Sequence, residues 1–223
     1  MSVSSADLGI LPIKKLLLKQ SVPASIGILF MSVNILIDTI FVGQWIGSLA
    51  IAAVSVVLPI TFLISSLGMA LGIGGSSIIS RALGANHHQK ALHTFGNQIL
   101  MTLGLALISV VGGLIYSDEV LLLFGANGNI MKPAKEFFIP VLYGVPFLAL
   151  CMMGNTVIRA EGKPKFAMIA MIIPAFSNII LDIVFIKIFN WGMFGAALAT
   201  SISYFMCFAF ILWFFIYKSE LRL

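Results

Sequence analysis

Long apolar runs separated by short polar segments make up nearly the whole chain. The runs lie at about 21–42, 50–78, 91–116, 134–158, 166–188 and 194–217. Each is close to or longer than the roughly 20 residues that cross the hydrocarbon core of a bilayer as an α-helix. The pattern predicts an all-α polytopic membrane protein with a six-helix transmembrane lobe at 21–217, an N-terminal segment at 1–20 and a C-terminal tail at 218–223.

The composition supports this prediction and excludes several other classes of protein. Hydrophobic residues make up 60% of the chain and charged residues 9%, whereas a soluble domain has about 25% charged residues. The net charge of +5 comes from Lys and Arg between the apolar runs, where such residues report membrane orientation rather than nucleic-acid binding. The first run is about twice as long as a signal-peptide core and lacks an A-x-A-like cleavage site, so we expect it to be retained.

The connecting segments alternate in charge. The segment 43–49 contains no basic residue, 117–135 mixes Lys132 and Lys135 with acidic residues, and 187–193 contains Lys187 alone. By the positive-inside rule, the other segments face the cytoplasm, so we expect both termini on the inner side of a bacterial cell membrane. The basic residues assigned to that side are Lys14, Lys15, Lys19, Arg81, Lys90, Arg159, Lys163, Lys165, Lys218 and Arg222.

Two of the basic segments share a local pattern, Arg-Ala-Leu-Gly at 81–84 and Arg-Ala-Glu-Gly at 159–162. An arginine in the last turn of a helix interacts favourably with the negative helix end, and a glycine just beyond it provides a left-handed cap. The pattern predicts two helix ends. A contact within a cytoplasmic gate is the alternative interpretation.

Two aspartates interrupt the apolar runs in similar surroundings. The segments 34–41 and 178–185 both read Asn-x-x-x-Asp-x-x-Phe, with Asp38 and Asp182 as the acids. The spacing of four places Asn34 and Asn178 on the same helical face as the acids. Both runs cross the membrane in the same direction, and at about 1.5 Å per residue the two acids lie roughly 6 and 9 Å below its outer boundary. We therefore expect the two carboxyl groups to meet.

Two polar residues on oppositely directed runs reach the same half of the membrane. By the same arithmetic, Tyr143 and Thr200 lie about 13 and 9 Å below the outer boundary. A charge within the membrane costs at least about 2.5 to 3.5 kcal/mol, and such residues usually mark ion or proton pathways. Structural hydrogen bonding between helices is the alternative for the uncharged members. The residues of this predicted site for a proton or a sodium ion are Asp38, Asn178, Asp182, Thr200, Tyr143 and Asn34.

Proline and glycine predict two mechanical features. Pro23 lies in the first apolar run, where it removes a helix hydrogen bond and favours a kink. Bent and straight forms of this helix would move Asp38. The glycine-rich segment 67–75 predicts that the second helix approaches a neighbour closely.

Taken together, these motifs resemble the N-terminal half of a multidrug and toxic compound extrusion (MATE) transporter, from about residue 16 to residue 223. The motifs that carry the resemblance are IDTIFVGQWIGSLAIAAVS (37–55), SRALGANHHQKA (80–91), LLFGAN (122–127), IRAEGKPKFAM (158–168), NIILDIVFI (178–186) and GAALATSIS (195–203). The resemblance implies a transporter rather than an enzyme. It would export cationic or amphipathic compounds in exchange for protons or sodium, without a cofactor.

The resemblance also implies roles for particular residues. An aspartate of the family's first helix matches Asp38, and the asparagine and aspartate of its fifth helix match Asn178 and Asp182. A threonine of the sixth helix matches Thr200, and a tyrosine of the fourth matches Tyr143. The proline at which the family's first helix bends matches Pro23. Asn34 rests on the Asn-x-x-x-Asp pattern alone.

The chain departs from the family in length, because family members have twelve helices in two six-helix lobes. Both termini of an even-spanning lobe lie on one side, so a second copy can pack in the same orientation as a homodimer. A second lobe on a separate chain, and a truncated remnant without transport, are equally compatible with the sequence. The expected partners are membrane lipid, small cationic or amphipathic substrates and a second lobe, and no nucleic acid.

Two other functions fit the sequence less well. A lipid-linked oligosaccharide flippase of the wider superfamily would need several basic residues inside its cavity, and the predicted spans carry no mid-membrane Lys or Arg. An intramembrane aspartyl protease would also use two aspartates that share a proton. Its Tyr-Asp and Gly-x-Gly-Asp signatures are missing at Asp38 and Asp182.

Overall fold

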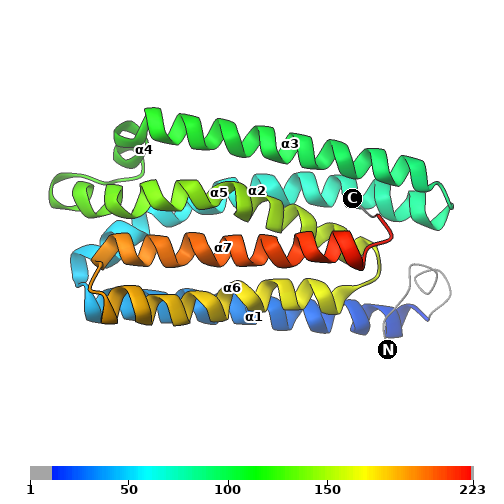
Figure 1. Cartoon of the computed structure of the whole chain (residues 1–223), viewed down its shortest axis with the longest axis horizontal. Coiled ribbons are helices and arrows are strands. Elements are labelled where there is room, and N and C mark those ends of the chain that lie inside the picture. The colour runs from blue at the N-terminus through cyan, green and yellow to red at the C-terminus, as the bar shows by residue number, and fades with distance from the viewer. Residues whose placement is uncertain (1–11, 222–223) are drawn as a thin grey trace.

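The computed structural model describes residues 12–221 as a bundle of long helices, with no β-strand in that range (Figure 1). Six of these helical segments are long and apolar enough to cross a membrane, so the chain is a multi-pass membrane protein. The elements are α1 (Ile13–Trp45), α2 (Ser48–Gly84), α3 (His88–Ile115), α4 (Ser117–Leu123), η2 (Gly128–Ile130), α5 (Met131–Ala160), α6 (Pro164–Asp182), η3 (Ile183–Ile188) and α7 (Gly192–Tyr217).

The helices extend beyond the apolar runs from which they were predicted. Helix α1 begins at Ile13 rather than near residue 21, so Lys14, Lys15 and Lys19 belong to the helix and not to a separate segment. Lysine side chains can reach polar surroundings from a helix end, so charge does not stop the helix where it ends the apolar run. The predicted connection 117–135 contains the short helix α4 and the 3₁₀ turn η2. Residues 1–11 and 222–223, including Arg222, lie outside the described residues.

The start of α1 and the end of α7 lie at the same end of the bundle, together with the α2–α3 and α5–α6 turns (Figure 1). We call this the basic end, because it holds Arg81 in the last turn of α2, Lys163 in the α5–α6 turn and Lys165 at the start of α6. Helix α5 packs against α2, α3 and α7, and α6 packs against α1 and α7. Helix α1 lies at the edge of the bundle, and among its residues only Gly27 and Val42 are buried.

The glycine-rich part of α2 forms the predicted close contact. Gly68 and Gly72 are buried against α5, and Gly75 is buried against the side chain of Gln98 on α3. A Cβ atom at Gly72 would lie 2.9 Å from the Cα atom of Met153 on α5. Side chains larger than hydrogen therefore do not fit here without moving backbone atoms.

We expect Gly72→Ala to destabilise the folded chain by about 1 to 3 kcal/mol, because it overpacks the contact between α2 and α5. The control is Gly74→Ala, since a Cβ atom at Gly74 meets no atom within 4 Å. Alanine favours a helix over glycine by about 1 kcal/mol, so the control should be neutral or stabilising. The melting temperatures of the purified variants in detergent test this, and an equal decrease in both would contradict it.

The two predicted helix ends differ in their caps. At the end of α5, Gly162 has a φ of 75° and provides the left-handed cap, as predicted. At the end of α2, Gly84 is still helical and Asn86, with a φ of 59°, takes the left-handed conformation, so the prediction for Gly84 was wrong. Asparagine also tolerates this conformation because its short polar side chain bonds locally.

Candidate functional site

Asp38 on α1 and Asp182 on α6 meet in the half of the bundle away from the basic end. Their carboxyl groups are close enough for a hydrogen bond once one of them holds a proton. The Asp182 side chain is fully buried, and that of Asp38 is partly buried. Asp38 Oδ1 and Asp182 Oδ2 are buried without a hydrogen-bond partner. The ion pairs among residues 12–221 involve neither acid, so the site offers two carboxyl groups and no counter-charge.

Two amides link these acids across the contact between α1 and α6. Asn34 Nδ2 donates a hydrogen bond of 2.7 Å to Asn178 Oδ1, and Asn178 Nδ2 lies 3.5 Å from Asp182 Oδ1. The spacing of four in each helix brings each amide to the face of its acid. The predicted convergence of the four side chains is present in the structure, and their role as cation ligands stays a prediction.

A cavity of about 90 Å³ opens beside Asp38, and Asp182 is not among its lining residues. Asp38, Asn178 and Thr200 line it, and no Lys or Arg does among the described residues. The Thr200 hydroxyl donates a hydrogen bond of 3.0 Å to the Ala196 carbonyl in its own helix. Its oxygen is therefore free to accept another hydrogen bond or to ligate a cation. The π-helical segment η3 begins directly after Asp182, and such segments are frequent at functional sites.

The size of this cavity decides what it can hold. A volume of about 90 Å³ accommodates one small cation or a few water molecules, since a water occupies about 30 Å³ of liquid. Drug-sized ligands occupy pockets of about 300 to 1,000 Å³. Carboxylate, amide and hydroxyl oxygens are ligands for hard cations, and no group of three or more His, Cys, Asp or Glu gathers among residues 12–221. The site therefore suits a proton or a sodium ion rather than a drug.

The structure does not bring Tyr143 to the site. Its side chain is 60% exposed and does not line the cavity, so the predicted convergence of Tyr143 with the acids was wrong. The depth arithmetic gave its height in the membrane but not the direction in which α5 presents it. Tyr204 on α7 lines the cavity with Asp38 instead. It lies four residues after Thr200, on the same helical face, which is the signal that could have identified it.

We expect Tyr204→Phe to weaken cation binding at the acids several-fold, because it removes the phenol that lines the cavity beside Asp38. Tyr143→Phe removes a hydroxyl from an exposed side chain and should change nothing. Proton- or sodium-dependent quenching of tryptophan fluorescence in the purified chain measures the affinity. A loss in Tyr143→Phe with none in Tyr204→Phe would reverse this assignment.

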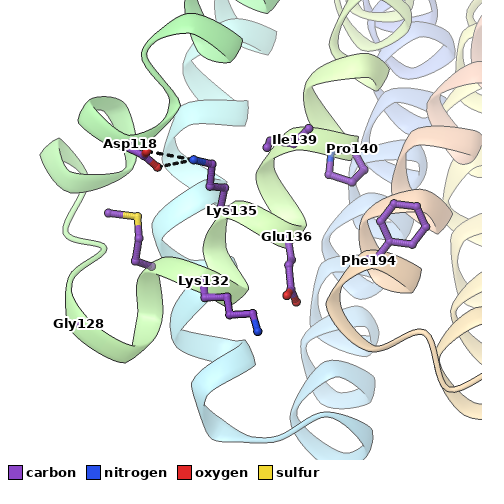
Figure 2. A pocket seen from close by; sticks show the side chains of 9 residues that line it. Asp118, Gly128, Lys132, Lys135, Glu136, Ile139, Pro140 and Phe194 are labelled. Carbon is purple, nitrogen blue, oxygen red and sulfur yellow. Dashed lines mark hydrogen bonds and ion pairs between the residues drawn. The ribbon is translucent and has the colours of Figure 1, made fainter.

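A wider groove of about 610 Å³ lies at the end of the bundle opposite the basic end, between α4, α5 and α7 (Figure 2). Its charged residues are exposed or partly exposed, and Lys135 Nζ pairs with Asp118 Oδ1 at 2.8 Å. Exposed pairs contribute about 0 to 1 kcal/mol. None of the predicted cation ligands lines this groove, so Asp118 provides an acid for control experiments.

A second buried acid lies at the basic end, outside the membrane-spanning segments. Glu161, in the α5–α6 turn, is fully buried and accepts hydrogen bonds from the Ser219 hydroxyl and from the Glu220 backbone N–H at 3.3 Å. Lys163 Nζ lies 3.4 Å from its carboxylate and also donates to the Lys218 carbonyl. These contacts hold the segment after α7 against the α5–α6 turn.

Burial raises the pKa of Glu161 above its ordinary value of 4.5, although its hydrogen bonds and Lys163 oppose this change. The folded chain then binds this proton more tightly than the unfolded chain. The resulting stabilisation is complete below about pH 4.5 and is lost as the pH rises through the raised pKa.

Glu161→Gln stays neutral at every pH, so we expect this variant to lose that pH dependence. The melting temperature of the wild type, relative to that of the variant, should fall as the pH rises from 4.5 through the raised pKa of Glu161. Glu119→Gln alters an exposed acid and should leave the slope unchanged. A difference between the wild type and Glu161→Gln that is constant with pH would contradict the expectation.

Comparison with known proteins extends these observations. The family model described as MatE matches residues 23–184. Multidrug export protein MepA of Staphylococcus aureus (strain MRSA252) is 30% identical over 209 residues, which cover 94% of this chain and 46% of that protein. The chain spans about half the length of the curated relatives it matches.

Solved structures give the same result. The MATE multidrug transporter DinF-BH is 36% identical and has a TM-score of 0.87, over 95% of this chain and 49% of that chain. MATE in the bent conformation is 30% identical with a TM-score of 0.86, and MATE in the straight conformation has a TM-score of 0.85. Each of these two matches covers 93% of this chain and 46% of the other.

Proposed function

The chain belongs to the MatE family, and on that premise we propose that it works as one lobe of a cation-coupled efflux transporter rather than as an enzyme. The observation that carries the proposal is the contact of Asp38 with Asp182, joined through the hydrogen bond between Asn34 and Asn178. The coupling ion is a proton or a sodium ion, and the exported compounds are cationic or amphipathic. In this proposal the basic end faces the cytoplasm of a bacterial cell, as the positive-inside rule expects.

The two acids would couple ion binding to a change in the helices that carry them. Two ionised carboxylates about 4 Å apart repel by roughly 4 kcal/mol at an effective dielectric constant of 20. Because each 1.4 kcal/mol is a factor of ten, this repulsion is large enough to shift a two-state equilibrium about a thousandfold. A bound proton or sodium ion removes the repulsion and draws α1 and α6 together, and release of the ion separates them.

Helix α1 is the element that this change would move. It lies at the edge of the bundle with few buried residues, and Pro23 lies within it on the basic-end side of Asp38. Proline leaves the carbonyl four residues earlier without its helix partner, so the helix can bend there at low cost. The similar MATE structures occur in a bent and in a straight conformation, which is consistent with an element of the lobe that bends.

A complete transporter would need a second six-helix lobe against the exposed apolar faces of α1 and α2. Ile28, Leu29 and Leu36 on α1, with Phe62 and Leu63 on α2, are among the large apolar side chains that are exposed. A second copy of this chain or a lobe on another chain would cover them. Mass spectrometry of the purified, denatured complex distinguishes the two sources, because a homodimer contains one chain mass and a complex of two different chains contains two.

The proposal is tested by ethidium efflux from an efflux-deficient bacterium that produces the complex. Efflux should follow an imposed gradient of protons or of sodium, and the gradient that drives it identifies the coupling ion. Efflux that is indifferent to both gradients, with the chain present in the membrane, would reject the proposal.

A further inference from the structure

A groove of about 820 Å³ lies toward the basic end and is lined mainly by residues of α1, α2 and α5. Unlike the cavity at the acids, it is large enough for a drug-sized molecule. Its lining changes along its length. Ile35 and Phe62 line the part nearer Asp38, whereas Ser76, Ser77 and Ser80 line the part near the basic end. A ligand with an apolar tail and a polar head would match this gradient.

The charge in this groove has one sign. Arg159, in the last turn of α5, lines the groove near its serines, and no Asp or Glu lines it among the described residues. Neither ion pair found in residues 12–221 includes Arg159. A cationic head group would meet a like charge here, whereas an anionic head group would find the counter-charge that the chain does not supply.

The Arg159 side chain is held in place from two directions. Its Nε donates to Asn155 Oδ1 at 3.0 Å, and an Nη2 hydrogen is directed at Met171 Sδ of α6 at 3.2 Å. Asn155 is in turn fixed by its own bond of 2.7 Å to the Ala167 carbonyl of α6. Three guanidinium N–H groups remain without a hydrogen-bond partner in the described part of the chain. An arginine fixed in this way binds phosphate or carboxylate with little further loss of freedom.

We propose that this groove binds amphipathic compounds that carry a phosphate or carboxylate group, with the anion on Arg159 and the apolar tail between α1 and α2. The inference rests on the proposed function and deepens its amphipathic class of compounds, as distinct from cations such as ethidium. The anion would accept hydrogen bonds from the free N–H groups of Arg159 and from nearby serine hydroxyls. The methionines Met31, Met69 and Met152 would pack around the tail, since their side chains adapt to varied shapes.

The test compares two probes of equal tail length, dodecyl phosphate and dodecyltrimethylammonium, bound to the purified full chain in neutral detergent. Native mass spectrometry measures the occupancy of each. We expect dodecyl phosphate to bind about tenfold more tightly, the factor that a charge-assisted hydrogen bond supplies. Equal binding, or preference for the cation, would overturn the proposal. This comparison needs no variant and no ion gradient, so its failure is distinct from a failure of cation-coupled efflux.

Variants then locate the anion. Arg159→Gln should lower the affinity for dodecyl phosphate about tenfold. Arg159→Lys, which keeps the positive charge, should retain part of the wild-type affinity. The matched control is Arg81→Gln, because Arg81 also lies in the last turn of its helix and bonds to Ser77 at 3.0 Å but does not line the groove. An equal loss in both glutamine variants would overturn the assignment to Arg159.

A final arm identifies the source of the anion. If a lipid head group is the natural occupant, phosphatidylglycerol should displace dodecyl phosphate and phosphatidylcholine should not. If a free amphiphile is the natural occupant, neither lipid should displace dodecyl phosphate. Displacement by phosphatidylcholine as readily as by phosphatidylglycerol would overturn the proposal, because it would show that the tail alone decides binding.

Discussion

Asp182→Asn is expected to reduce ethidium efflux to the level of cells that lack the protein. The substitution keeps the shape of a fully buried side chain but replaces a group that can bind and release a proton or ligate sodium as an anion. Without the charge on residue 182, the two side chains no longer repel each other when no ion is bound. Ion release then cannot drive α1 and α6 apart. Efflux is measured as the loss of ethidium fluorescence after energising the cells.

The matched control is Asp118→Asn, which removes a carboxylate from the exposed pair with Lys135 (Figure 2). It makes the same chemical change outside the proposed cation site and should leave efflux unchanged. Both variants must reach the membrane in wild-type amounts, which an immunoblot of the membrane fraction measures. Wild-type efflux in Asp182→Asn at normal abundance would remove the acids from the coupling mechanism.

Pro23→Ala is expected to have the second largest effect. Alanine restores the backbone N–H that proline lacks and removes the ring that crowds the preceding turn, which favours a straight helix by about 3 kcal/mol. This change would lower the population of a bent α1 by about a hundredfold. Efflux should fall accordingly, although every residue of the proposed cation site is intact.

The distance between spin labels on α1 and α6 near the basic end reports the bend directly. In the wild type it should change when the coupling ion is added, and in Pro23→Ala it should stay at one value. Val22→Ala alters the neighbouring exposed side chain without restoring a helix hydrogen bond, so it should behave as the wild type. Equal ion-dependent changes in all three proteins would show that α1 does not bend at Pro23.

The architecture was predictable because each helix must satisfy its own backbone hydrogen bonds within the membrane, so apolar length alone identifies it. The pairing of Asp38 with Asp182 was also predictable. Both helices run in the same direction, and a shared Asn-x-x-x-Asp spacing fixed the amides and acids on one face of each. These constraints act within single helices or follow from the depth of each acid in the membrane.

Other features depend on contacts that no single helix encodes. Whether Tyr204 or Tyr143 lines the cavity depends on how α5 and α7 are rotated within the bundle. The depth of a residue in the membrane does not specify this rotation. The position of Arg159 depends on Asn155, which reaches the Ala167 carbonyl on α6. Either Gly84 or Asn86 could provide the left-handed cap at the end of α2, because both residue types tolerate this conformation. Local propensity alone therefore did not predict that Asn86 would provide it.

Infrared difference spectroscopy of the purified chain between acidic and neutral pH tests most directly whether Asp38 and Asp182 form one ion-exchanging unit. A protonated carboxyl group inside the membrane gives its own C=O stretching band. We predict one such band for the pair, removed by Asp38→Asn and by Asp182→Asn alike, and displaced by sodium if sodium is the coupling ion. Two separate bands, each lost in only one variant, or a band that survives both substitutions, would contradict a shared site.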